Sequence, residues 1–184
     1  MSIELILIVV VVLLVGVMLL YNSLVQGRLR VREAWSAIQV QLQRRVSLIP
    51  NLVETVKGYA SHERETLDSV TQARSQLQNA TTPGDAAQAN NMMTQALKTL
   101  FAVAEAYPDL KANQNFLDLQ AQLADTEDKI AYARNFYNSR VLSYNTTIHT
   151  IPGVFVAGPL GFAPEEFFGA SEAAQNEVQV TFSR

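Results

Sequence analysis

An unbroken apolar run near the N-terminus constrains this chain more than any other feature. Between Leu5 and Leu20 there is no polar side chain, and Ile3 and Tyr21 extend the run. A helix needs about 20 predominantly apolar residues, within a range of about 17–25, to cross a bilayer. Tyr21 also lies where an interfacial aromatic residue belongs. The run therefore predicts a transmembrane helix, with residues 1–27 forming an anchor.

A cleaved signal peptide is the alternative interpretation of this run. Such peptides begin with basic residues and have a shorter apolar stretch, about 7–15 residues. This chain carries Glu4 and no lysine or arginine at its start, and Val25-Gln26-Gly27 is a poor cleavage site. We therefore expect the anchor to be retained.

The charges that follow the run predict its orientation. Arg28, Arg30 and Arg32 come directly after it, and Arg44 and Arg45 lie further on. Because arginine-rich flanks tend to stay in the cytoplasm, we expect the N-terminus outside and the rest of the chain in the cytoplasm. The first three arginines could set the topology alone or could also contact anionic headgroups, and both interpretations stay open.

Three later segments repeat apolar residues at intervals of three and four, as one face of a helix requires. The first face comprises Val31, Trp35, Ile38, Leu42, Val46, Ile49, Val53, Val56 and Ala60, and continues in phase through Leu67, Val70 and Leu77. The second comprises Ala89, Met93, Ala96, Leu100, Val103 and Tyr107. The third comprises Phe116, Leu119, Leu123, Thr126, Ile130, Ala133, Tyr137, Tyr144 and Ile148. This spacing predicts an all-α fold, in which an elongated up-and-down helical bundle over residues 28–150 continues from the transmembrane helix.

The number of long helices depends on whether the first segment breaks. Pro50 lies inside it, and Gly58 and Ser61 mark a second weak point. Because the apolar phase survives to Leu77, we favour one long kinked helix and therefore three long helices. A break between Pro50 and Ser61 would give four.

Other local signals mark the later helix ends. Thr82 precedes Pro83 as an N-cap, Pro108 ends the second periodic segment, and Asn113 is a cap for the third. In the third segment, Tyr137-Asn138 and Tyr144-Asn145 repeat seven residues apart. We interpret the tyrosines as core residues with hydroxyls at the bundle edge, and the asparagines as cross-helix hydrogen-bond partners. A polar recognition stripe is the alternative.

The C-terminal tail, residues 151–184, combines helix breakers with aromatic residues. Its prolines and glycines exclude a helix between Pro152 and Pro164, while Val154-Phe155-Val156 and the alternation around Val180 suggest extended segments. Five phenylalanines would form an apolar surface if left exposed: Phe155, Phe162, Phe167, Phe168 and Phe182. We expect this irregular apolar tail to dock, either on its own bundle or on a neighbouring subunit or the membrane surface.

The residues of the central run carry a family resemblance. The matching segments are Ala34-Trp35-Ser36, Val40 to Arg45, Leu48 to Ala60, His62-Glu63, Ala104 to Ala112, Tyr137-Asn138, Tyr144-Asn145, Gly161-Phe162 and Phe167-Phe168. With these segments the chain resembles the LemA family of bacterial membrane proteins. The resemblance implies an N-terminal span in the inner membrane and a helical bundle, but no established activity. One branch of the family is similar to a magnetosome-formation protein, which suggests membrane organisation as a role.

No pattern in the sequence predicts catalysis or a cofactor. The chain has no cysteine, and His62-Glu63 lacks the second histidine of a zinc-protease motif. His149 is expected to end a helix, and neither histidine has a glutamate three residues before it, as a di-iron bundle requires. Asp125, Glu127 and Asp128 form either a solvated helix face or a weak divalent-cation site.

These observations lead to one functional hypothesis and one alternative. The net charge of −3 argues against nucleic-acid binding. We expect a non-enzymatic, membrane-anchored scaffold or adaptor that self-associates and contacts the lipid bilayer. The alternative is an accessory regulator of another membrane protein, such as an envelope protease or a signalling protein.

Overall fold

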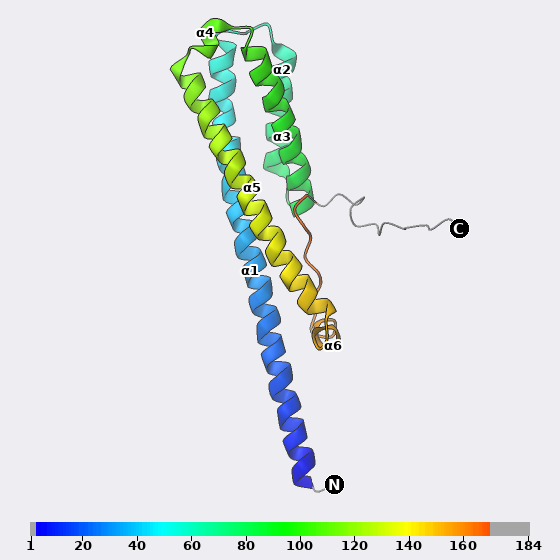
Figure 1. Ribbon diagram of the computed structural model, residues 1–184. Helices are drawn as coiled ribbons and strands as arrows, with labels where there is room; N and C mark the ends of the chain where they lie inside the picture. Colours follow the sequence, from blue (N-terminus) through cyan, green and yellow to red (C-terminus); the bar gives the residue numbers. More distant parts are fainter. Residues whose placement is uncertain (1–2, 170–184) are drawn as a thin grey trace, which may run out of the picture. The chain divides into compact units, whose positions relative to one another are not determined.

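The computed structural model describes residues 3–169, and every regular element in this range is a helix (Figure 1). The elements are α1 (Ile3–Lys57), α2 (Arg64–Asn79), α3 (Pro83–Ala104), α4 (Pro108–Lys111), α5 (Gln114–His149) and α6 (Gly153–Ala157). The prediction of an all-α fold with a long apolar N-terminal helix is confirmed. The described residues group into two compact units, one built from 3–37 and 135–166 and the other from 38–134 and 167–169.

The second unit is a four-helix bundle. The C-terminal part of α1, then α2, α3 and the N-terminal part of α5 run alternately up and down (Figure 1). The predicted apolar faces form its core, because the side chains of Ile49, Val70, Met93, Leu100 and Leu123 are all buried. Interlocking residues at intervals of three and four are how such bundles exclude water.

The favoured single helix through residue 77 is wrong, because α1 ends at Lys57 and α2 begins at Arg64. Gly58, a weak helix former, starts the turn, and the backbone N–H of Ala60 closes it on the carbonyl of Val56 at 2.8 Å. Ala60 remains buried in the turn. The three- and four-residue spacing of apolar side chains therefore continues from α1 into α2 although the chain reverses direction between them. For this reason the spacing alone could not reveal the break.

Pro50 does not break α1, although it lies within the helix. Proline lacks the N–H that would otherwise bond to the carbonyl four residues earlier, which is that of Val46. In the structure Nε of Arg74, on α2, donates to the carbonyl oxygen of Val46 at 3.3 Å. A neighbouring helix thus supplies the hydrogen bond that the proline removes.

Side-chain contacts fix the other ends of the bundle helices. The hydroxyl of Thr82 accepts from the N–H of Asp85 at 3.1 Å, and Oδ1 of Asn113 accepts from the N–H of Phe116 at 3.1 Å. Both predicted N-caps are therefore confirmed. The short α4 was not predicted. Next to it, the hydroxyl of Tyr107 donates to Glu63 at 2.8 Å and ties this end of the bundle to the turn before α2.

The first unit pairs two antiparallel helical stretches, residues 3–37 of α1 and 135–149 of α5 (Figure 1). The helices approach closely at Gly27, where an added Cβ would lie 3.1 Å from the ring of Tyr144. The rings of Trp35 and Tyr137 lie 5.7 Å apart between their centroids. Within the described chain, α1 has the length and apolar composition to cross a membrane, and none of its most apolar window is buried.

The region between residues 150 and 164 contains a helix, α6, so the prediction that its prolines and glycines exclude one is wrong. Val154-Phe155-Val156 is therefore helical rather than extended. Pro152 precedes the helix, where its missing N–H costs nothing, and the segment turns again at Gly161, which has a φ of 75°.

Candidate membrane-contact site

The residues that flank the apolar run lie on the part of α1 that contacts α5 and the segment after α6. Tyr21 is partly exposed and meets the ring of Phe162 edge-on, with 5.7 Å between the centroids. Nε of Arg28 lies 3.2 Å from Oε1 of Glu165. Arg30 and Arg32 are exposed. Of the three arginines predicted to flank the membrane, one is thus held by a carboxylate within the chain.

Three hydrogen bonds attach the segment after α6 to α5. The side chain of Asn145 exchanges a pair of bonds with the backbone of Glu165, each 2.9 Å long. The hydroxyl of Tyr137 donates to the carbonyl of Glu166 at 2.7 Å. Burial, reinforced by Glu165 and Glu166, raises the pKa of Tyr137 to about 12. Tyr137 and Tyr144 are both buried, as predicted. The hydroxyl of Tyr144 is also buried and has no hydrogen-bond partner among the described residues, so its predicted place at the bundle edge is wrong. Asn145 bonds to the chain that returns from α6 and not to another helix.

α6 itself presents two apolar faces. Gly153 and Ala157 are buried against the rest of the first unit. The opposite side carries Val154 and Phe155, and Phe155 is 72 % exposed. This short helix is therefore packed on one side and uncovered on the other.

A polar groove lies between α1 and α5 in the same unit, with a volume of about 440 Å³. It is lined by Leu19, Asn22, Ser23, Gln26, Gly27, Arg30, Arg140, Ser143, Tyr144 and Thr147. No carboxylate lines it, and among the described residues neither Arg30 nor Arg140 forms an ion pair. Guanidinium groups in this state can bind phosphate or carboxylate groups from outside the chain.

The predicted docking phenylalanines do not share one environment. Phe155 is exposed, Phe162 contacts Tyr21, and Phe167 is half-buried. Phe168 is buried. Phe182 lies outside the described residues. Phe168 is therefore covered by its own chain, and a docking role for the others stays a prediction.

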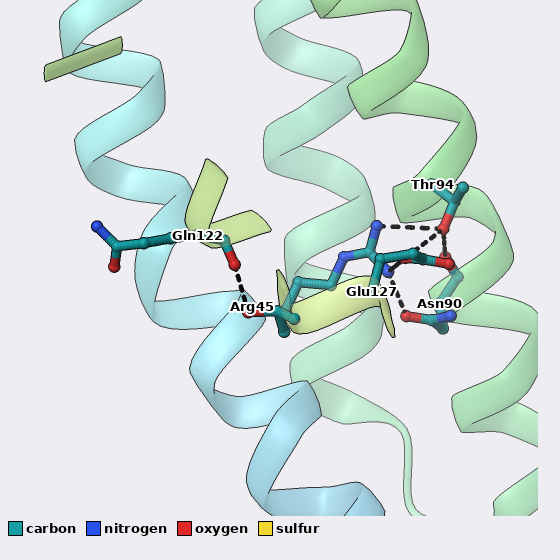
Figure 2. Close-up of polar contacts among 6 residues, drawn as sticks. Arg45, Asn90, Thr94, Gln122 and Glu127 are labelled. Carbon is teal, nitrogen blue, oxygen red and sulfur yellow. Dashed lines mark hydrogen bonds and ion pairs between the residues drawn. The ribbon is translucent and has the colours of Figure 1, made fainter. Parts of the chain in front are cut away.

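A buried polar cluster in the second unit was missed by the sequence analysis (Figure 2). Only 3 % of the Arg45 side chain is exposed, and its guanidinium donates to Asn90 at 2.7 Å, to Thr94 at 3.1 Å and to Glu127. Burial lowers the pKa of Arg45, and the charge of Glu127 opposes this shift. The adjacent pair Arg44-Arg45 resembles a charged surface in sequence, so only its helical phase, in line with Ile38 and Leu42, hinted at burial.

Two of the three acidic residues in the predicted α5 group, Asp125 and Glu127, pair with cations. Asp125 accepts from Lys129 at 2.9 Å and from Arg44 at 2.8 Å, and these bonds lower its pKa. Glu127 binds Arg45. The predicted solvated helix face fits this arrangement, because Asp128 is exposed and the side chains of Asp125 and Glu127 are 45 and 43 % exposed. Over residues 3–169, no group of three or more histidine and acidic side chains could hold a metal ion.

Neither histidine joins a cluster of chemical groups. His62 is exposed in the turn before α2, and His149 is the basic residue in the last turn of α5, as expected. The polar groups of the Arg45 cluster hold helices to one another, and those around Glu165 hold the segment after α6 to α1 and α5. The arrangement therefore favours packing and contact surfaces over chemistry.

The fold and these contacts define a class: a helical-bundle protein whose first helix could span a membrane. Residues 34–182 match the LemA family, and the chain belongs to that family. Protein LemA of Metamycoplasma hominis is 30 % identical over 87 % of this chain and 74 % of its own length. Magnetosome protein MamQ of Magnetospirillum gryphiswaldense is 24 % identical over 86 % of this chain and 68 % of its own length. Magnetosome protein MamQ 2 of Paramagnetospirillum magneticum is 25 % identical over 92 % of this chain and 72 % of its own length.

Proposed function

We propose that this protein is a non-enzymatic scaffold or adaptor, anchored in the bacterial inner membrane by α1, that self-associates through its helical surfaces. One contrast carries the proposal. The buried guanidinium of Arg45 is bound by Asn90, Thr94 and Glu127 within the bundle, whereas large apolar side chains beyond the apolar run stand exposed. Among them are Leu29, Val40, Tyr132 and Leu142, with exposed fractions of 55, 60, 76 and 59 %. Exposed apolar side chains of this kind suit contact with another protein surface.

The orientation follows from the charges after the apolar run. Arg28, Arg30 and Arg32 flank its C-terminal end, and Arg140 adds a further positive charge in the same unit. Arginine close to a span favours the cytoplasmic side of the membrane. The proposal therefore places the N-terminus outside and the bundle in the cytoplasm.

The similarity to magnetosome proteins favours a structural role at a membrane. The likeness to the two magnetosome proteins extends over 86 and 92 % of this chain. We extend this to a membrane-organising role for the protein. Regulation of another membrane protein is the alternative, and it predicts a different partner on the same exposed surfaces.

Single cysteines provide a clean test of self-association, because the natural chain has none. The variants are Leu142→Cys and Val40→Cys, with Ser139→Cys and Gln39→Cys as exposed polar controls on the same two helices. Membranes carrying each variant would be oxidised and analysed by non-reducing electrophoresis. The scaffold predicts crosslinked homodimers from at least one apolar position and few from the controls. If all four variants stay monomeric and a different protein copurifies in mild detergent, the scaffold proposal is wrong and the chain is a regulator of another membrane protein.

A further inference from the structure

The segment around α6 leaves a continuous stretch of apolar side chains uncovered. Ile151, Val154, Phe155 and Leu160 are 78, 45, 72 and 45 % exposed, and together we call them the α6 patch. No charged residue lies between His149 and Glu165. Exposed apolar surface without charges is uncommon on a soluble surface and marks a site of contact.

The other face of the segment is already packed. Gly153 and Ala157, four residues apart, are buried, and a Cβ on Gly153 would lie only 1.9 Å from the carbonyl oxygen of Thr147. The α6 patch therefore cannot turn inward without displacing residues that are in close contact. A helix that is apolar on all sides is one that is covered on all sides.

Contacts within the first unit fix the position of the patch. The ring of Phe162 lies against Tyr21, directly after the apolar run, and Glu165 binds Arg28 one turn beyond Leu24. The chain that leaves α6 is therefore tied to α1 at the residues where the membrane surface would cross that helix.

We propose that the α6 patch inserts into the lipid interface beside the transmembrane segment, as a second membrane contact. This inference rests on the proposed membrane anchor. Lipid fits the patch because its backbone groups need few outside partners. The N–H groups of Val154, Leu160 and Phe162 bond to carbonyls of Thr150, Val156 and Ala157, respectively. A bilayer offers no hydrogen bonds to backbone groups, so such internal pairing is what insertion requires.

The charges of the same unit complement a lipid surface. Thr147, which packs against Gly153, also lines the polar groove that contains Arg30 and Arg140. In a lipid leaflet the phosphate groups lie outside the acyl chains. Arginines without a carboxylate partner can bind the phosphates while the adjacent apolar patch contacts the acyl chains. Amphipathic segments that lie in the membrane interface combine the same two features.

The test uses the full-length chain in vesicles, with one environment-sensitive fluorophore (NBD) on a single introduced cysteine. Phe155→Cys reports on the α6 patch. Leu14→Cys, in the middle of the apolar run, reports on the anchor, and Ser139→Cys is an exposed polar position of α5 in the same unit. Thermal unfolding followed by circular dichroism checks that each variant folds. The quenchers are two phospholipids: one carries a nitroxide near the headgroup end of its acyl chain, at the depth expected for Phe155→Cys, and the other carries it near the far end of the acyl chain, at the depth expected for Leu14→Cys.

The proposal predicts blue-shifted emission and strong quenching by the nitroxide lipid of matching depth at Phe155→Cys and Leu14→Cys, with little of either at Ser139→Cys. Quenching at Leu14→Cys but not at Phe155→Cys would overturn the insertion of α6 and leave the anchor intact. Absence of quenching at both positions would overturn the anchor itself. A blue shift at Phe155→Cys without quenching, accompanied by disulfide crosslinking of the unlabelled variant, would assign the patch to a second copy of the chain and overturn the proposal.

Discussion

Removing either partner of the buried Arg45–Glu127 ion pair should have unequal effects on stability. Glu127→Ala leaves a guanidinium buried without a counter-charge, which costs about 3–5 kcal/mol in a fully buried pair. Because 43 % of the Glu127 side chain is exposed, water screens the charge, and we expect a loss of about 1–2 kcal/mol. For a chain of this size, that corresponds to a decrease in Tm of roughly 2–8 °C.

Arg45→Met should be milder, because it removes the charge together with the cost of its desolvation. Methionine is flexible enough to fill the space of the arginine stem, so we expect a change within about 1 kcal/mol. The double variant should be about as stable as Arg45→Met alone, since Glu127 pairs with no other cation among residues 3–169. Asn90 and Thr94 lose the Arg45 donor in both backgrounds, and the double variant loses in addition only the long 3.4 Å contact from the Thr94 hydroxyl to Glu127.

The assay is thermal unfolding of the full chain in detergent micelles, followed by circular dichroism at the helical minimum. Glu54→Ala is the matched control, because Glu54 pairs with Lys57 on the surface with 73 % of its side chain exposed. We expect this control to change stability by less than about 0.5 kcal/mol. The reasoning would be refuted if Arg45→Met lowered Tm as much as Glu127→Ala and the two losses added in the double variant.

Three further predictions concern the backbone and the pH dependence. Arg74→Met should lower the free energy of unfolding by about 1 kcal/mol in the natural chain. In a Pro50→Ala background it should have almost no effect, because the N–H of the introduced alanine can bond to the carbonyl of Val46 instead. Equal decreases in Tm in both backgrounds would contradict this. Gly153→Ala should destabilise the first unit by about 1–3 kcal/mol, seen as faster limited proteolysis near α6, and unchanged cleavage would argue against the close packing. Because burial raises the pKa of Tyr137 to about 12 while an unfolded tyrosine titrates near 10, stability should fall as the pH rises between these values. Tyr137→Phe should flatten that part of a Tm-against-pH curve, and an unchanged slope would show that another group is responsible.

The sequence predicts the bundle well because its helices are long and its apolar intervals are regular. Ile49, Met93 and Leu123 are buried as their spacing requires, and the capping residues Thr82 and Asn113 act as their chemistry predicts. A helical period of 3.6 residues repeated over many turns leaves little freedom in which face turns inward.

The turn before α2 could not be predicted in the same way. Pro50 is a strong helix breaker in isolation, but Arg74, far away in the sequence, compensates for it. Gly58 is a weak breaker, yet the chain reverses there because the helices that follow bury apolar faces against α1. By local propensity the helix should break at Pro50 rather than at Gly58. Tertiary contacts reverse this order, because they compensate for the proline and favour the turn after Lys57.

The candidate site was predicted in part. The apolar run and its arginines stand out in the sequence, but the pairing of Arg28 with Glu165 and the contact of Tyr21 with Phe162 join residues far apart in the chain. The number of prolines and glycines after residue 150 concealed α6, since a helix this short needs only a few residues free of breakers. Burial of Arg45 likewise depends on partners contributed by α3 and α5.

The central claim is that α1 is retained in the membrane with its N-terminus outside and the bundle in the cytoplasm. Ser2→Cys and Asp109→Cys, each the sole cysteine, can be treated with a membrane-impermeant maleimide in intact cells and again after lysis. The account predicts that the full-length band of Ser2→Cys is labelled in intact cells and that Asp109→Cys is labelled only after lysis. Labelling of Asp109→Cys in intact cells, or loss of the introduced N-terminal thiol from the mature band, would contradict it.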